Sequence, residues 1–267
     1  MSELDLGREE LRELATQVIA AAGDPTEPFG VYLFLPEQPE SELPRSVERA
    51  VFDEFFGNSA ELLDAEYRPY EDGVFFVCVL DQLRRLPAGM ARVGRPMGLP
   101  LKTFVDIEKM WGTKVEDLRA TGSGADWVPE ETWDSLTLGV ERDYRGKATD
   151  GLISLGIFQT GTQSMRRCEA RTTVAILDCN VLDLVQSMLA DPYQRFDGLE
   201  PQVYLDSPAS VPVLLDLEEW EPRLRAGAPP FHDIMFGGTG LEATVRPPEW
   251  APLLDVDRSG GSATQAL

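Results

Sequence analysis

The sequence predicts an α/β fold of the α+β kind, in which helices cover both faces of one mixed sheet. Two dense strand patterns, at residues 73–80 (GVFFVCVL) and 87–96 (PAGMARVGRP), are joined by a short polar segment and predict a hairpin. From residue 132 onward, strand and helix patterns alternate. The chain has 267 residues, of which 43% are hydrophobic and 26% charged, so it can bury a sizeable core.

The segment before the hairpin predicts a helix, a strand and a second helix. Apolar residues recur at helical spacing over 4–22 until Gly23-Asp24-Pro25 stops the pattern. Residues 29–35 (FGVYLFL) predict a short buried strand. The second helix, expected from residue 43 to 55, ends at Gly57-Asn58, because glycine commonly follows a helix.

The later elements are expected to complete the sheet. Residues 112–131 are polar and rich in glycine, which indicates a loop over a short helix. Strands are expected at 132–140, 172–177, 202–205 and 211–217, and helices at about 150–167 and 180–189. Beyond about residue 227, proline and glycine with isolated aromatic residues predict an extended or disordered tail. We therefore expect an N-terminal extension (1–42), a central domain (43–225) and a partly disordered tail (226–267).

The charge balance excludes several classes of partner. Lys and Arg number 24 against 46 Asp and Glu, which gives a net charge of -22, so the protein repels polyanions and is not expected to bind nucleic acid. The first residues are acidic, where a signal peptide needs positive charge, and no run of about 18 apolar residues occurs. We expect a cytoplasmic protein that does not enter a membrane.

Few residue types are available for catalysis. The chain has one histidine, His232, and three scattered cysteines, Cys78, Cys168 and Cys179, which we interpret as reduced. Ser-His-Asp triads, Cys-His dyads and zinc sites are therefore not expected, and no metal is predicted. Chemistry must use carboxylates, hydroxyls, thiols, backbone groups or a bound cofactor.

A basic window interrupts the acidic chain. Residues 1–66 hold sixteen acids and four bases, whereas residues 82–105 hold five bases and no acid. Either these bases are solvated surface residues whose acidic partners lie elsewhere, or they form an anion site for a phosphate-bearing ligand.

Residues 133–151 (WDSLTLGVERDYRGKATDG) combine a strand, a turn and the start of a helix. A helix that begins directly after a strand points its free N–H groups toward the end of that strand, where phosphates bind well. The phrase TLGVERDYRGKA resembles the strand, turn and helix at the centre of the GNAT acyltransferase superfamily, whose Q/R-x-x-G-x-G/A turn wraps the pyrophosphate of coenzyme A.

The resemblance covers about residues 43–217. VFDEFFG at 51–57 and AGMARVGRP at 88–96 are most similar to the branch of acyl-homoserine-lactone synthases and PEP-CTERM-associated acyltransferases. It implies a mostly antiparallel GNAT-like sheet whose central strand splays from its neighbour. It also implies transfer of an acyl group from acyl-CoA or acyl carrier protein to an amine or amino-acid-like acceptor, without a tightly bound cofactor.

The resemblance also implies roles for particular residues. Backbone N–H groups near Leu138 and Val140 would polarise the thioester carbonyl. Arg92 would hold a carboxylate or phosphate of the substrate, with an exposed strand arginine as the alternative. Trp111 and Trp133 would line an acyl channel, with core packing as the alternative. The expected donor-binding residues are Arg145, Gly146, Lys147, Ala148 and Asn180.

Three residues are candidates for proton transfer. Asp134 and Glu141 flank the central strand and are possible general bases for the amine, although acids at strand ends are often solvated or paired. Ser187 occupies the position at which many GNAT enzymes have a tyrosine acid. Tyr193 lies nearby and is a candidate replacement.

The departures from the family pattern keep a second hypothesis open. Ala148 and Asp150 stand where the turn usually has small residues, and Asp150 either brings negative charge there or caps the next helix. WDSLT at 133–137 lacks the Ser-Arg pair of the lactone synthases, so lactone synthesis is not expected. The alternative is a catalytically inactive GNAT-like module whose tail and N-terminal helix contact a protein partner.

Overall fold

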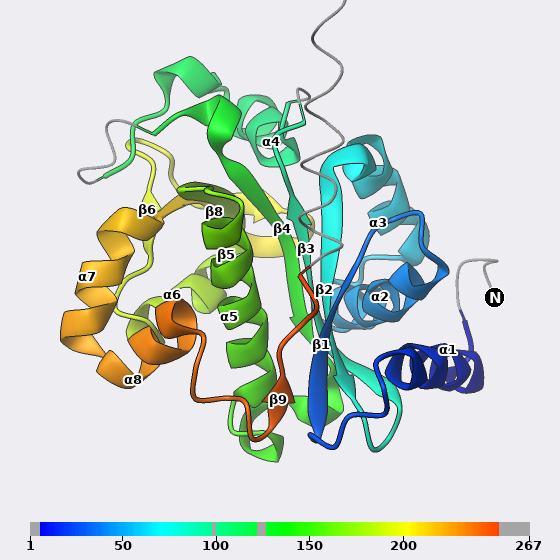
Figure 1. Cartoon of the computed structure of the whole chain (residues 1–267). Coiled ribbons are helices and arrows are strands. Elements are labelled where there is room, and N and C mark those ends of the chain that lie inside the picture. Colours follow the sequence, from blue (N-terminus) through cyan, green and yellow to red (C-terminus); the bar gives the residue numbers. More distant parts are fainter. Residues whose placement is uncertain (1–5, 98–99, 122–126, 251–267) are drawn as a thin grey trace, which may run out of the picture.

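The computed structural model describes residues 6–97, 100–121 and 127–250 and contains a nine-stranded sheet (Figure 1). Its strands are paired in the order β6-β8-β5-β4-β3-β2-β1-β9, and β7 pairs with β8 beside this path. The strands are β1 (Phe29–Phe34), β2 (Val74–Asp81), β3 (Leu86–Gly94), β4 (Trp133–Val140), β5 (Thr172–Asp178), β6 (Tyr193–Arg195), β7 (Gln202–Tyr204), β8 (Ser207–Asp216) and β9 (Val245–Arg246).

The sheet is mixed and mostly antiparallel, which confirms the predicted fold class. Parallel pairing joins β4 to β5 and β1 to β9, while the other described pairs are antiparallel. The expected hairpin is β2 with β3. Every residue of these two strands is buried, which explains why their sequences are almost continuously apolar.

Helices cover both faces of the sheet. Eight α-helices are described: α1 (Arg8–Ala21), α2 (Glu42–Phe56), α3 (Ala60–Tyr67), α4 (Lys102–Trp111), α5 (Leu152–Arg167), α6 (Cys179–Met188), α7 (Leu217–Gly227) and α8 (Pro229–His232). The core formed by α1 and α2 lies on one face, and the larger core that α5 and α7 share lies on the other. Helix α4 packs against β4 and β5. None of the helices in the described part of the chain is long and apolar enough to cross a membrane.

The helix ends follow local chemistry. Helix α2 ends where Gly57 adopts φ 69°, a left-handed conformation that glycine adopts without a steric penalty. Helix α6 begins at the end of β5, where Asp178 accepts hydrogen bonds from the N–H groups of Asn180 and Val181.

The expected tail is packed as far as residue 250. Helix α8, a π-helical turn (Asp233–Gly237) and β9 follow α7, and β9 lies beside β1. Met235, Phe236 and Val245 are buried in the core shared with α5. The prediction of an extended or disordered segment is therefore wrong for residues 229–246, because isolated apolar residues pack here without a periodic pattern. The rest of the predicted tail, 251–267, lies outside the described residues.

Candidate functional site

Strands β4 and β5 separate to form a V. They pair only at Trp133 with Thr173 and at Asp134 with Val174. The hydroxyls of Ser135 and Thr173 lie 3.0 Å apart beside these pairs. Beyond them, no described strand pairs with the β5 side of β4, so main-chain N–H groups there are available to a ligand.

A β-bulge lies in β4 at the same level. Arg92 of β3 pairs with Thr137 and Val93 pairs with Ser135, so Leu136 is an extra residue in β4. A bulge changes which face later side chains point to. The Thr137 hydroxyl consequently donates to Glu48 of α2, while Leu138 lines the opening of the V.

A cavity of about 190 Å³ occupies the V and reaches both faces of the sheet. On the α5 face its wall is apolar and includes Ile157, Phe158, Met165, Val185, Leu189 and Trp220. On the α2 face its wall includes Phe52, Phe56, Tyr67, Arg92 and Tyr204. An apolar cavity with a few polar groups is typical of a small-molecule site.

The turn at 141–151 connects β4 to α5. Gly146 and Gly151 have φ values of 57° and 76°, and a Cβ atom on either would meet no atom within 4 Å. Backbone conformation, not packing, is therefore what favours glycine at both positions. Gly151 occupies the N-cap position of α5, so the interpretation of Asp150 as the cap is wrong.

Arg145 holds this turn against α2. Its Nε donates to the Val140 carbonyl at 2.6 Å and its Nη1 to Glu54 at 2.9 Å. Its guanidinium carbon also lies 4.7 Å from the centre of the Phe55 ring. Lys147, in contrast, is exposed and has no ion pair among the described residues. Of the two basic side chains predicted to bind phosphate, Lys147 is therefore the one without a competing carboxylate.

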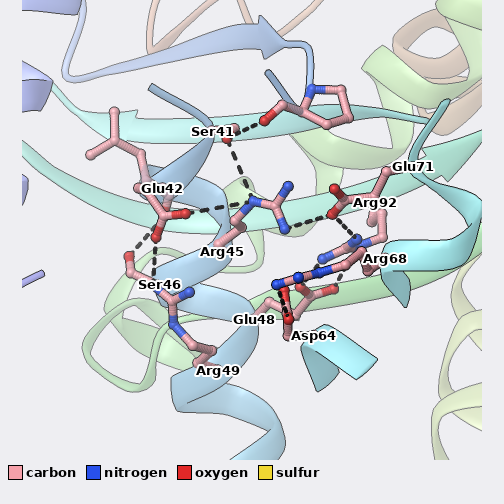
Figure 2. A network of polar contacts seen from close by, with 12 residues as sticks. Ser41, Glu42, Arg45, Ser46, Glu48, Arg49, Asp64, Arg68, Glu71 and Arg92 are labelled. Carbon is pink, nitrogen blue, oxygen red and sulfur yellow. Dashed lines mark hydrogen bonds and ion pairs between the residues drawn. The ribbon is translucent and has the colours of Figure 1, made fainter. Parts of the chain in front are cut away.

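Arg92 belongs to a buried ion-pair network between α2 and β3, part of which Figure 2 shows. Its Nε and Nη2 donate to the two Glu48 oxygens at 3.0 and 2.6 Å, and its Nη1 donates to Glu71 at 3.3 Å. Arg45 pairs with Glu71 at 2.7 Å. Arg92 lines the cavity, but its N–H groups are already paired with carboxylates of the protein itself, so its substrate-binding role stays a prediction.

A second polar cluster adjoins the cavity at Tyr204. The Tyr204 hydroxyl accepts a hydrogen bond from Lys102 at 3.0 Å and donates one to Asp106 at 2.5 Å. Lys102 also forms ion pairs with Asp106 and Glu66. Burial, together with the neighbouring Tyr67 and Asp106, raises the pKa of Tyr204 far above its usual value, so this hydroxyl keeps its proton.

The two predicted bases do not line the cavity. Asp134 is buried and accepts hydrogen bonds from the Thr103 N–H at 2.9 Å and the Thr103 hydroxyl at 2.6 Å. It lies beside a small separate pocket near α4. Glu141 accepts from the N–H of Arg142 at the start of the turn. Their positions do not support a base at the cavity.

Asp134 should make stability depend on pH. Burial raises its pKa to about 6, against hydrogen bonds from Thr103 that lower it. Since the unfolded value is about 3.9, the folded state binds this proton more tightly, and the resulting stabilisation is present below pH 4 and lost as pH rises through 6. The measured quantity is the unfolding free energy of the wild type minus that of Asp134→Asn. We expect this difference to fall by up to about 3 kcal/mol between pH 4 and pH 7.

Urea denaturation at several pH values measures this difference. Asp143→Asn, a change at an exposed aspartate in the turn, is the control and should show no comparable dependence. A difference that is constant with pH would mean that Thr103 keeps Asp134 ionised throughout.

Of the other predicted residues in this group, Tyr193 lines the cavity, whereas Trp111, Trp133, Ala148 and Asn180 do not. Tyr193 lines the cavity, and burial raises its pKa to about 12, so it is a neutral hydroxyl. Trp133 packs edge-on against Phe75 in the core, and the Trp111 indole donates to the Glu200 carbonyl; neither lines the cavity. The predicted donor-binding residues Ala148 and Asn180 lie in the turn and in the first turn of α6, outside the cavity wall.

Sequence reasoning missed several cavity residues. Tyr204 and Asp178 lie at strand ends, and Gly161 lies within α5, where its face opens on the cavity. The aspartate between a strand and a helix is a usable N-cap signal for Asp178. No local signal marks Gly161 or Tyr204.

Two solved structures have a similar fold. One is FeeM, an N-acyl amino acid synthase from uncultured soil microbes, with a TM-score of 0.53 and 11% identity over 75% of this chain and 97% of that one. The other is BjaI, a CoA-dependent acyl-homoserine lactone synthase, with a TM-score of 0.50 and 14% identity over 87% of this chain and 100% of that one. The chain has a GNAT-type fold.

Within this GNAT-type fold, the V between β4 and β5 is the splay that the sequence resemblance implied. The sequence itself matches no protein-family model and no curated protein. At these identities the likeness establishes the fold, and activity has to be argued from the cavity.

Proposed function

We propose that the protein is an N-acyltransferase that moves an acyl group from an acyl thioester to an amine. The apolar cavity in the V, beside the unpaired edge of bulged β4, carries this proposal. The named activities of FeeM and BjaI, which share the fold, support it.

The donor fits along the V with its phosphates at the turn. Lys147 and the N-terminus of α5 offer positive charge and N–H groups to a phosphate, and the edge of β4 leads from the turn to the cavity. We propose acyl-CoA as the donor. The acyl chain then occupies the apolar wall formed with α5 and α7.

The reaction is direct acyl transfer. Main-chain N–H groups of β4 near Leu138 and Val140 stabilise the developing negative charge on the carbonyl oxygen. The neutral amine nitrogen attacks the carbonyl carbon, the C–N bond forms and the C–S bond breaks. One amine proton passes to solvent and the thiolate gains one, which gives an amide and a free thiol. Asp134 and Glu141 are not assigned to this step because neither lines the cavity.

Acyl-CoA binding tests the proposal through Lys147. Ligand at about 100 times its Kd stabilises a protein by roughly 2.7 kcal/mol, so acyl-CoAs should raise the Tm measurably. We expect Lys147→Ala to weaken acyl-CoA binding several-fold and to leave binding of acyl-pantetheine, which has no phosphate, unchanged. Lys114→Ala, at another exposed lysine, is the matched control.

The outcomes separate the two hypotheses. Release of the thiol in the presence of an amine supports an acyltransferase. Release from acyl carrier protein but not from acyl-CoA would identify the carrier protein as the donor. Thioester binding without transfer to any amine supports the catalytically inactive module. A protein that melts cooperatively and responds to no thioester contradicts the acyltransferase and leaves a module that contacts a protein partner.

A further inference from the structure

The cavity wall contains two charged side chains among the described residues, Arg92 and Asp178. An acceptor must place its reactive amine in this cavity, and any further charge on the acceptor needs a partner there. Whether each of these two side chains is already paired within the protein therefore limits which acceptors fit.

Arg92 is not available to a substrate carboxylate. Glu48 takes two of its N–H groups and Glu71 takes a third. The rings of Tyr67 and Phe76 each lie 4.7 Å from its guanidinium carbon, and the side chain is only 2% exposed. A substrate carboxylate would have to displace Glu48, which is also 2% exposed and would be left as a buried, unpaired charge.

Lys102, which donates a hydrogen bond to Tyr204, is also paired with carboxylates of the protein. It is 2% exposed, and it is paired with Asp106 and Glu66 and hydrogen-bonded to Tyr204. Its positive charge is balanced within the protein and does not reach the cavity wall.

Asp178, unlike Arg92 and Lys102, has no ion-pair partner among the described residues. It ends β5 at the wide end of the V. Partial burial acts to raise its pKa, but hydrogen bonds from Ser207 and from the N–H groups of Asn180 and Val181 hold the pKa below its usual value. At neutral pH it is a carboxylate that forms no ion pair with the residues that the structure describes.

We infer that the acceptor is a primary amine without a free carboxylate, and that Asp178 holds its positive charge at the wide end of the V. This inference rests on the proposed acyltransferase function and names the substrate class of the same site. Asp178 acts as a positioning residue: the amine loses its proton to solvent before it attacks.

Acceptor pairs that differ only in the carboxylate test this inference. Tyramine against tyrosine and agmatine against arginine are compared with one acyl-CoA, by release of the CoA thiol and by product mass. We expect kcat/KM to be at least about tenfold higher for the amine in each pair, because the carboxylate finds no cation. Tyrosine methyl ester, in which the carboxylate is masked, should behave like tyramine.

A substitution at Asp178 tests the positioning role. Asparagine caps helices as well as aspartate does, so Asp178→Asn should keep the start of α6 intact. We expect its KM for the amine to rise about tenfold while kcat changes little. Asp183→Asn, an exposed change on the same helix, is the matched control and should leave both constants unchanged.

The possible failures are distinguishable. Equal or faster acylation of the amino acid in each pair overturns the inference and leaves the acyltransferase function standing. Binding of acyl-CoA with transfer to none of these acceptors also overturns it. Loss of acyl-CoA binding itself refutes the proposed function, and the inference fails with it.

Discussion

Replacing Gly161 by leucine is expected to slow transfer of long acyl chains strongly while short chains still react. Gly161 lies on α5 in the wall of the cavity, and a Cβ atom there would meet no other atom within 4 Å. A leucine side chain at this position therefore extends into the cavity without displacing the core. Since one methylene changes selectivity by 10- to 200-fold, we expect kcat/KM for the longest accepted chain to fall by about 100-fold.

Gly161→Ala is the graded control for this variant. It adds one methyl group, and in a helix interior alanine is about 1 kcal/mol more favourable than glycine, so the Tm should rise. Rates over a series of acyl-CoA chain lengths measure the shift for both variants. An unchanged chain-length profile for the leucine variant would show that the acyl chain does not occupy the α5 side of the cavity.

The sequence predicts best the elements whose ends or interiors carry a local pattern, such as a terminating glycine or an apolar run. Helix α2 ends at Gly57 as expected, and the hairpin of β2 and β3 follows from its apolar runs. Strand β6 has three residues and exists because it pairs with β8. Helix α8 packs against α7, and β9 pairs with β1, and no local pattern shows either contact.

The charges in the basic window at 82–105 show that the charge pattern of a segment does not reveal which residues it contacts in the fold. Its two interpretations are solvated residues whose acidic partners lie elsewhere, or an anion site. Arg92 and Lys102 do have acidic partners outside the window, but both are buried and not solvated. The partner Glu48 lies on another element, and Asp106 follows just beyond the window. A run of bases without acids therefore indicated contacts across the fold.

The site depends on strand register, which a single sequence specifies poorly. The bulge at Leu136 and the early end of pairing between β4 and β5 create the cavity. Only the resemblance to a known family implied the splay. Asp134 precedes the bulge and lies at the end of the V where β4 still pairs with β5, and there it faces Thr103 of α4 and not the cavity.

Arg92→Met is expected to cost about 3–5 kcal/mol of unfolding free energy, the largest stability effect that we predict. Methionine fills part of the space but leaves Glu48 and Glu71 without the guanidinium. A single buried carboxylate without a partner is more costly than a missing pair. The double variant Glu48→Leu with Arg92→Met should therefore recover much of the loss, because it removes both charges.

Arg68→Met provides the comparison on the same face of the protein (Figure 2). Arg68 pairs with Asp64 on α3, but its side chain is 66% exposed, so we expect a loss of less than about 1 kcal/mol. Urea denaturation at neutral pH compares the variants, with unchanged m-values as the check that the unfolded states are alike. Equal losses for Arg68→Met and Arg92→Met would mean that water reaches Glu48. In that case Arg92 could also exchange Glu48 for a substrate carboxylate, so the stability measurement bears directly on acceptor choice.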